Sequence, residues 1–275
     1  MGDIIKVNDL VSKNLDMKVV TIISNLESED ARHEDTALAH LLSKYFQTEI
    51  IDIFDNSIFY KKDFFLVRNI WGRSGGSERM LEIYKDFSKR NICYSNSLTG
   101  KGDQTGKRYL VDLYNVGYQV VATFDNLKKA LQYKSPEYLL KPIYGGSGKG
   151  IISVSAENLS QQFDGDKYII QPKIEFSSEL SLFFVDNTFH HALRTKNDRW
   201  DLGLYAPTQE ELALANQFVQ WNPVVGIQRV DFLKTHENKI LLLELEDWCP
   251  YLSLLDVANM PTESFVSAIA RSIEK

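Results

Sequence analysis

The sequence is poor in cysteine, in long hydrophobic runs and in excess positive charge. Its 2 cysteines, Cys93 and Cys249, lie far apart and lack the close spacing of a metal-binding motif. They predict reduced thiols in a cytoplasmic protein rather than a disulfide framework. No stretch is long and apolar enough to cross a bilayer, and residues 1–16 lack the hydrophobic core of a signal peptide.

Charge and composition exclude further classes of protein. The 275 residues carry a net charge of -6, which argues against a general nucleic-acid or membrane-surface binder. Hydrophobic residues make up 44% and charged residues 25%, as is ordinary for a soluble globular protein. We find no repeat and no low-complexity tract, so we expect one large domain or two to three lobes with an ample core.

An acidic hairpin is the most informative stretch, and it spans residues 226–250. It reads as two strands joined by a short polar turn. Residues two apart on a strand share a face, so Arg229 lies beside Asp231, and Glu244 beside Glu246. Closing the hairpin at that turn predicts Glu244 opposite Arg229, within a residue, with Asp231 on the diagonal.

Three carboxylates on one face repel one another unless a proton or a cation lies between them. Their apolar neighbours, residues 241–243, make an unpaired charge costly. A hard cation with oxygen ligands would relieve both the repulsion and the cost of unpaired charge, and Mg²⁺ is the first candidate. The hairpin therefore predicts a metal site. The alternative is that Glu244 and Glu246 line the solvated face of an amphipathic strand.

A glycine-rich loop follows the strand that carries Lys141. Its members are Gly145, Gly146, Ser147, Gly148, Lys149 and Gly150. Backbone N–H groups of such a loop can surround phosphate oxygens. It is no P-loop, because Gly150 follows Lys149 where that motif needs Ser or Thr, and β-branched residues follow in place of a helix. The segment predicts a β-hairpin flap over a nucleotide, or else a flexible hairpin turn.

Several basic residues also stand where ligands bind. Lys101, Lys107 and Arg108 precede a helix, where cations oppose the helix dipole unless a phosphate binds there. Arg68 follows a strand end, a usual place for ligand contacts in α/β sheets. It either contacts an anion or pairs with a neighbouring carboxylate.

The order of expected elements predicts a small N-terminal α/β layer ending near residue 100. Its first helix has Asp35 or Thr36 as its expected cap. Further on, residues 119–123 predict a strand, Thr208 begins a capping box, and a last helix starts at Thr262.

This ordered set of motifs resembles the ATP-grasp superfamily of carboxylate–amine ligases, in its glutathione-synthetase-like branch, which includes the ligase group of cycloserine biosynthesis. The resemblance covers residues 65–255 and is carried by YLLKPIYGGSGKGI, YIIQPKIEFSSELSLFFVDNTFHHALRTK and QRVDFLKTHENKILLLELEDWCPYLSLL. It implies an α/β (α+β) ATP-grasp fold, in which an N-terminal α/β domain precedes two lobes that clamp ATP. The expected bounds are 1–100, 101–168 and 169–275.

The resemblance also implies roles for individual residues. ATP phosphates would be bound by Lys107 and Lys141 under the flap of residues 145–150. Adenine would be held by Gln171, Pro172, Lys173 and Ile174, and the ribose by Glu179. The Mg²⁺ ligands would be Asp231, Glu244 and Glu246. Arg229 would steady an acyl phosphate, with Arg194 as a second candidate.

Two departures from the family pattern stand out. Glu246 replaces an Asn found in many relatives, and Gln171-Pro172 replaces an acid and a Lys. The residues that would recognise the acceptor are not identifiable, although the resemblance directs attention to Arg68, Trp71 and His191.

The implied function is an ATP- and Mg²⁺-dependent ligase, with Mn²⁺ as a second ion. It would activate a small carboxylate, an amino acid or short peptide, as an acyl phosphate and join it to an amine, releasing ADP and phosphate. The alternatives are a kinase that stops at phosphoryl transfer and a non-catalytic nucleotide-binding regulator. No nucleic acid or membrane partner is expected, and the sequence leaves open whether the chain forms a homo-oligomer.

Overall fold

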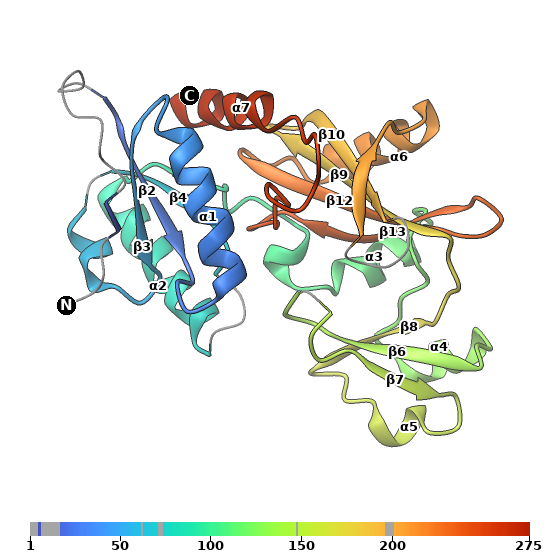
Figure 1. Ribbon diagram of the computed structural model, residues 1–275. Coiled ribbons are helices and arrows are strands. Elements are labelled where there is room, and N and C mark those ends of the chain that lie inside the picture. The colour runs from blue at the N-terminus through green and yellow to red at the C-terminus, as the bar shows by residue number, and fades with distance from the viewer. Residues whose placement is uncertain (1–4, 7–16, 62, 71–73, 147, 196–200) are drawn as a thin grey trace.

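The computed structural model describes residues 5–6, 17–61, 63–70, 74–146, 148–195 and 201–275. Expectations that concern Ser147, Trp71 or the rest of residues 1–16 lie outside these ranges. Within them, three β-sheets form three bodies, drawn in Figure 1 at the left, at the bottom and at the upper right. No helix in these ranges has the length and apolarity that crossing a membrane requires.

The first sheet forms the expected N-terminal α/β layer. Its order is β1-β3-β2-β4-β5, and all neighbours are parallel except β1 and β3. The strands are β1 (Ile5–Lys6), β2 (Val19–Ser24), β3 (Gln47–Asp52), β4 (Phe64–Val67) and β5 (Tyr94–Ser95). Successive strand residues point to opposite faces, so α1 (Glu29–Leu42) packs on one face and α2 (Gly76–Arg90) on the other. A 3₁₀ turn, η1 (Asn56–Tyr60), follows β3.

Helix α1 begins earlier than the sequence predicts. The Ser28 side chain caps it, and two acidic residues fill its first turn, where negative charge is favoured. The expectation that Asp35 or Thr36 is the cap is therefore wrong. Asp35 instead lies buried within the helix, on the side that faces the sheet.

The second sheet is small and antiparallel, with the order β7-β6-β8. Its strands are β6 (Glu137–Pro142), β7 (Ile152–Ser155) and β8 (Tyr168–Pro172). Helices α4 (Leu127–Gln132) and α5 (Leu159–Gln162) cover one face and share its core. The β6–β7 hairpin carries the glycine-rich loop, as expected. The domain bounds expected at residues 100 and 168 stay a prediction. Strand β8 begins at residue 168 and pairs with β6.

The third sheet is antiparallel, with the order β11-β10-β9-β12-β13. Its strands are β9 (Ser178–Val185), β10 (Thr188–Thr195), β11 (Leu202–Tyr205), β12 (Ile227–Lys234) and β13 (Ile240–Glu246). Helices α3 (Tyr109–Asn115) and α6 (Gln209–Trp221) share the core of one face. The capping box that starts at Thr208 is confirmed, whereas β11 and the 3₁₀ turn η2 (Asp103–Thr105) were not predicted.

Helix α7 (Thr262–Glu274) starts where the sequence predicts and joins the first and third sheets. Figure 1 shows it lying along the top of both bodies. One buried cluster contains residues of α1, α7, the first sheet and the other face of the third sheet, among them Phe183 and Phe265. The first and third sheets therefore share a hydrophobic core.

Residues 119–124 connect the second and third sheets. Among the described residues they form two isolated bridges, Val120 with Leu242 of β13 and Phe124 with Ile170 of β8. The expectation of a strand at 119–123 is wrong, because the segment passes from one sheet to the other and pairs with neither along its length.

The hairpin β12–β13 differs in register from the prediction. Arg229 pairs with Glu246, and Asp231 with Glu244. The turn closes one residue later than expected, with Thr235 N–H donating to the Lys239 carbonyl at 2.8 Å. The register then shifts once more between Asp231 and the next residue. As a result Glu244 lies directly opposite Asp231 rather than opposite Arg229.

Candidate active site

Three carboxylates converge at the end of the β12–β13 hairpin. Oxygens of Asp231, Glu244 and Glu246 all lie within 4.8 Å of one another. They share the sheet face that is turned away from α6, because all three alternate with residues of the α6-side core. Converging carboxylate oxygens are a donor set that suits Mg²⁺. The structure thus brings together the three residues that the sequence singled out.

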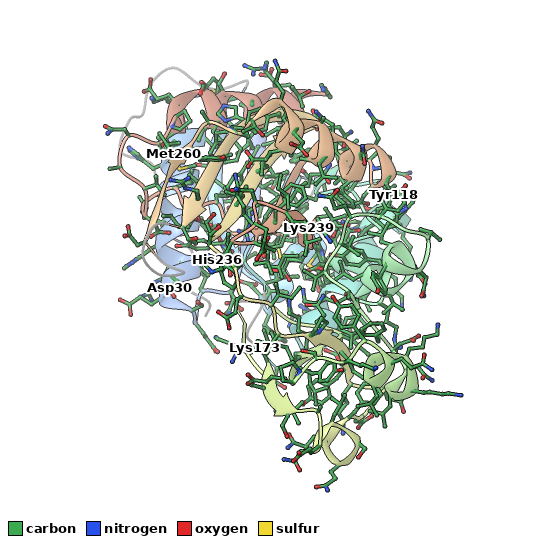
Figure 2. All side chains as sticks on the ribbon, turned by 90° about the vertical axis from the view of Figure 1, so that its right-hand side faces the viewer. Asp30, Tyr118, Lys173, His236, Lys239 and Met260 are labelled. Atoms are coloured by element: carbon green, nitrogen blue, oxygen red, sulfur yellow. The ribbon has the colours of Figure 1, made fainter. Side chains whose placement is uncertain are left out.

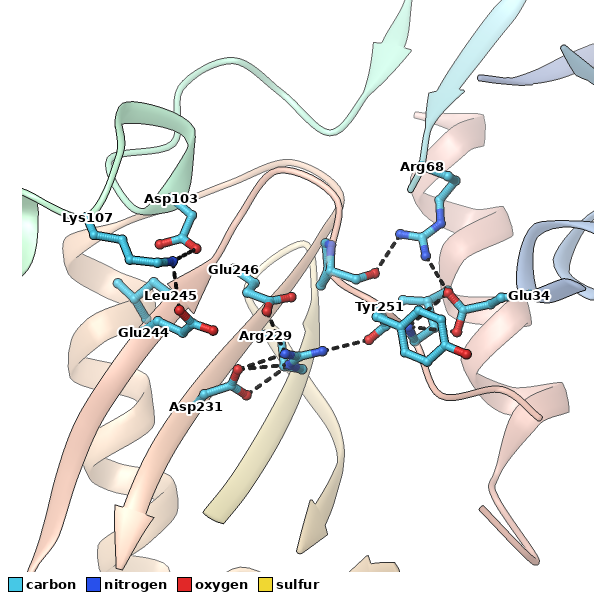
Figure 3. Close-up of polar contacts among 12 residues, drawn as sticks. Glu34, Arg68, Asp103, Lys107, Arg229, Asp231, Glu244, Leu245, Glu246 and Tyr251 are labelled. Carbon is cyan, nitrogen blue, oxygen red and sulfur yellow. Dashed lines mark hydrogen bonds and ion pairs between the residues drawn. The ribbon is translucent and has the colours of Figure 1, made fainter. Parts of the chain in front are cut away.

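Arg229 lies within this cluster as an internal counter-ion. Its Nε donates to Asp231 Oδ1 at 2.9 Å and its Nη2 to Asp231 Oδ2 at 2.8 Å. The same Nη2 donates to Glu246 Oε1 at 2.7 Å (Figure 3). A guanidinium presents its N–H groups in a rigid plane, so these contacts fix its orientation as well as balancing charge.

Burial and neighbouring charges shift the pKa values of Glu244 and Glu246 in opposite directions. Burial raises the pKa of Glu244, but the positive charges of Lys107 and Lys141 outweigh it and lower the pKa to about 2. Burial also raises the pKa of Glu246, and the neighbouring carboxylates take it to about 8 despite the opposing charge of Arg229. Glu244 is therefore ionised at neutral pH, whereas Glu246 needs a further cation to ionise fully.

The two predicted phosphate lysines come from different bodies of the fold. Lys107 precedes α3, and its Nζ lies 2.6 Å from Asp103 Oδ2 and 2.7 Å from Glu244 Oε2 (Figure 3). Lys141 lies buried on β6; burial lowers its pKa to about 8, against the raising effects of Glu244 and Glu179. Both lysines therefore lie within electrostatic reach of the carboxylate Glu244.

The predicted adenine segment lies where β8 leads into the third sheet. Ile174 packs on a buried apolar cluster formed by Val121, Leu233 and Leu241. The buried Gln171 donates from Nε2 to Thr123 Oγ1 at 2.9 Å. Both residues therefore face the junction between the two sheets.

The remaining members of this set differ in where their side chains lie. Pro172 is buried opposite Tyr138 of β6. Lys173 pairs with Glu137 at 2.9 Å on the surface, and Figure 2 shows it where the lower body joins the rest. Because the Lys173 side chain lies on the surface, only its backbone lies beside the junction. Glu179 pairs across β9–β12 with Leu233 and lies on the Asp231 face.

The flap backbone adopts conformations that favour glycine. Positive φ angles of 126°, 71° and 77° occur at Gly145, Gly148 and Gly150. A Cβ at Gly145 or Gly146 would meet no atom within 4 Å, so these residues border open space. The described part of the loop therefore leaves its backbone accessible to a ligand.

Arg194 does not join the cluster. It pairs with Leu180, whose side chain belongs to the α6-side core, so the two side chains point to that face. Its guanidinium lies 5.0 Å from the Tyr205 ring centroid. This corrects the expectation that Arg194 acts beside Arg229.

The other basic candidates also have structural partners. Lys101 donates to the Trp221 carbonyl at 3.1 Å, and Arg108 to the Gly165 carbonyl at 2.5 Å. Arg68 is 1% exposed and paired with acids of α1, so of the two readings of Arg68 the ion pair is confirmed. His191 shares the Arg229 face but stacks on the intervening Phe183 ring, 4.5 Å between centroids.

Sequence reasoning missed two acids that support Lys107. Asp103 holds its amine, and the only signal was a spacing of four residues in a polar loop. Asp247 accepts from Gly102 N at 2.7 Å and Gln104 N at 2.9 Å, and so fixes the loop before Lys107. Its position directly after Glu246 was a usable signal, because a third acid in this apolar stretch needs buried partners.

Comparison with known proteins supports the fold through structure rather than through sequence. No protein-family model matches the sequence, and no curated protein is detectably similar to it. Among solved structures, the D-cycloserine synthetase DcsG is 17% identical with a TM-score of 0.70, over 93% of this chain and 99% of that chain.

Two further solved structures are similar to this chain over the same extent. The ATP-grasp ligase PsnB complexed with a minimal precursor is 12% identical, with a TM-score of 0.66 over 93% of this chain and 99% of its own. The D-alanine–D-alanine ligase from Bacillus anthracis complexed with ATP is 13% identical, with a TM-score of 0.66 over 94% and 97%. All three matches extend over nearly the full length of both chains, and the chain has the ATP-grasp fold.

Proposed function

We propose that this protein is an ATP- and Mg²⁺-dependent ligase that activates a small carboxylate as an acyl phosphate and joins it to an amine. One observation carries the proposal. Lys107 and Lys141, from separate parts of the fold, approach the same acidic hairpin that gathers Asp231, Glu244 and Glu246. A site for transferring a phosphoryl group needs such a combination of fixed cations and metal-binding carboxylates.

In this proposal the phosphates of ATP bind to Lys107 and Lys141 beneath the flap. Adenine occupies the junction lined by Gln171 and Ile174, and Glu179 binds the ribose. Mg²⁺ held by the three carboxylates would neutralise phosphate charge and orient the phosphate oxygens. Arg229 would stabilise the negative charge of the acyl phosphate.

The reaction balances without any oxidant or reductant. A substrate carboxylate oxygen attacks the γ-phosphorus, a P–O bond forms, and ADP leaves. An amine nitrogen then attacks the acyl carbon, a C–N bond forms, and phosphate leaves with the amine proton transferred to solvent. Closure of the flap would exclude water, which otherwise hydrolyses the acyl phosphate.

The ligands of the solved neighbours support the proposed ligands of this protein. One PsnB complex contains Mg and ADP, and the D-alanine–D-alanine ligase was solved with ATP. The D-alanine–D-alanine ligase supports an amino acid as the carboxylate substrate, and MdnC and PsnB, both solved with precursor peptides, support a short peptide. Mn²⁺ is our second choice of ion. We propose the cytoplasm as the compartment, because both cysteines are free thiols.

A trapping experiment tests the function. The protein is incubated with ATP, Mg²⁺, hydroxylamine and a panel of amino acids and dipeptides, and hydroxamate and ADP are measured. We expect hydroxamate that depends on one substrate class and is lost in Asp231→Asn and Glu244→Gln, with both variants folded by circular dichroism.

Two outcomes would favour the alternatives. ADP with a stable phosphorylated product and no hydroxamate would indicate a kinase. Tight ATP binding without turnover on any substrate would indicate a regulator. Full activity in both variants would contradict the metal assignment.

A further inference from the structure

A buried ion cluster lies between α1 and the end of β4, away from the carboxylates of the hairpin. Arg68, Glu34 and Asp35 are 1%, 1% and 0% exposed. Arg68 Nη2 donates to Glu34 Oε2 at 2.9 Å, and its Nε to Asp35 Oδ1 at 3.3 Å. Burying charges costs several kcal/mol per ion, on the order of what their mutual attraction returns. The cluster is therefore better explained by what it holds than by added stability.

The ion cluster forms hydrogen bonds with the backbone of the loop that follows β13. Arg68 Nη1 donates to the Pro250 carbonyl at 2.8 Å. Glu34 accepts from the Leu252 N–H, at 2.9 Å to Oε1 and 3.1 Å to Oε2. Two residues of the N-terminal layer thus fix the peptide groups on both sides of Tyr251.

The opposite side of this loop contacts Arg229. The Tyr251 carbonyl accepts from Arg229 Nη1 at 2.8 Å. Figure 3 shows Arg68 and Arg229 approaching the loop from opposite sides, with Tyr251 between them. The other two nitrogens of Arg229 are bound to Asp231 and Glu246, so the Tyr251 carbonyl is the contact that ties the guanidinium to the loop.

We propose that Glu34 and Arg68 are positioning residues for Arg229. By holding Pro250 and Leu252 they fix the Tyr251 carbonyl, and that carbonyl sets the plane in which Arg229 presents its N–H groups. The link joins the N-terminal layer to the acidic hairpin through one loop. Its catalytic consequence rests on the proposed function, in which Arg229 stabilises the acyl phosphate; the link itself does not.

The link can be measured on Arg229 directly, without a substrate. In ¹⁵N-labelled protein the Arg229 Nε–H signal is identified by its loss in Arg229→Lys. Glu34→Gln places an amide N–H₂ group where Arg68 and Leu252 both need an acceptor. We expect the Arg229 signal to shift and its exchange with solvent to speed up by about tenfold or more. The control Glu29→Gln changes an exposed acid of the same helix and should leave both unchanged.

A second variant covers the case in which Glu34→Gln fails to fold. Arg68→Lys keeps the charge but cannot reach Pro250, Glu34 and Asp35 together, so it should alter the Arg229 signal in the same way. If either variant speeds exchange of the Leu252 amide yet leaves the Arg229 signal unchanged, the proposal is wrong.

The catalytic consequence has a separate measurement. In the trapping experiment both variants should lower kcat for hydroxamate about tenfold or more while leaving KM for ATP unchanged, because neither residue touches the proposed nucleotide site. A merely structural role would instead change kcat and KM in parallel with loss of folded protein. Failure of wild-type protein to form hydroxamate would contradict the proposed function but would leave the Arg229 measurement intact.

Discussion

At the scale of single residues, chemically similar acids are given different properties by their neighbours. Glu244 and Glu246 are two positions apart on one strand, yet Lys107 and Lys141 hold the first ionised while burial among carboxylates raises the pKa of the second. The acids of α1 show the same contrast. Among the described residues, Glu34 accepts from Arg68 and from the Leu252 N–H, whereas Asp35 has the Ser24 hydroxyl among its partners.

Asp35 offers a stability prediction with a definite pH range. Burial, opposed by Arg68 and reinforced by Glu34, raises its pKa from 3.8 to about 6. A carboxyl whose pKa is higher in the folded state stabilises the fold below its unfolded pKa, and this contribution is lost as the pH rises through about 6. Asp35→Asn should remove that loss, and we expect its free energy of unfolding at pH 7 to rise by about 1–3 kcal/mol.

The asparagine suits the site because its oxygen can face Arg68 and Asn69 while its amide donates to the Ser24 hydroxyl. Urea unfolding between about pH 4 and pH 7 provides the measurement. Asp30→Asn, at a surface acid of the same helix shown in Figure 2, is the control. An unchanged pH slope in Asp35→Asn would contradict the assignment of the shift to Asp35.

At the scale of elements, two neighbouring glycines of the flap differ in backbone conformation but have the same room for a side chain. Gly145 has a φ of 126° and Gly146 has no positive φ, yet a Cβ at either would meet no atom within 4 Å. Gly145→Ala should therefore be strained by about 1–2 kcal/mol, whereas Gly146→Ala should be tolerated. We expect Gly145→Ala to weaken ATP binding about tenfold by calorimetry, with Gly146→Ala as the matched control. Equal affinity in the two variants would show that the flap conformation does not matter for ATP binding.

The elements also show which features a sequence can predict. The converging carboxylates were predictable because residues two apart on a strand share a face, and a hairpin brings two such pairs together. The exact pairing was not, because it depends on where the turn closes and on the register shift after Asp231. Arg194 was named through the resemblance and not from strand geometry, and the face that it occupies could not be read from the sequence. A register shift between Phe189 and His191 changes which residues of β10 share a face.

Longer-range contacts were also beyond sequence reasoning. The start of α1 was missed because its first turns are polar and its periodic apolar residues begin only near Leu38. The contact of Arg68 with Pro250 joins residues that are 182 positions apart. Such contacts depend on how the sheets pack together, and no local pattern encodes them.

At the scale of the whole molecule, the three bodies do not have three separate cores. The first and third sheets share one buried cluster through α1 and α7, whereas most buried residues of the second sheet form a cluster with α4 and α5. Ile169 of β8 packs instead in the cluster of the third sheet with α3 and α6. In the proposed function the second sheet would close over a nucleotide, and a small body whose core is largely its own can move against a larger one with little disturbance of either core. We therefore expect the first and third sheets to unfold together.

Phe265 of α7 tests this expectation, because it is fully buried and its ring lies 5.8 Å from that of Phe183 in the third sheet. Phe265→Ala should lower the free energy of unfolding by about 3–5 kcal/mol. Amide exchange should then speed up together in β2 and β9 but not in β6, because β6 lies outside the shared core. The matched control is Leu140→Ala, which removes a side chain from the cluster of the second sheet and should affect β6, β7 and β8 but not β2 or β9. Loss of protection in β9 without β2 would mean that α7 stabilises only the third sheet, and that the two sheets unfold independently.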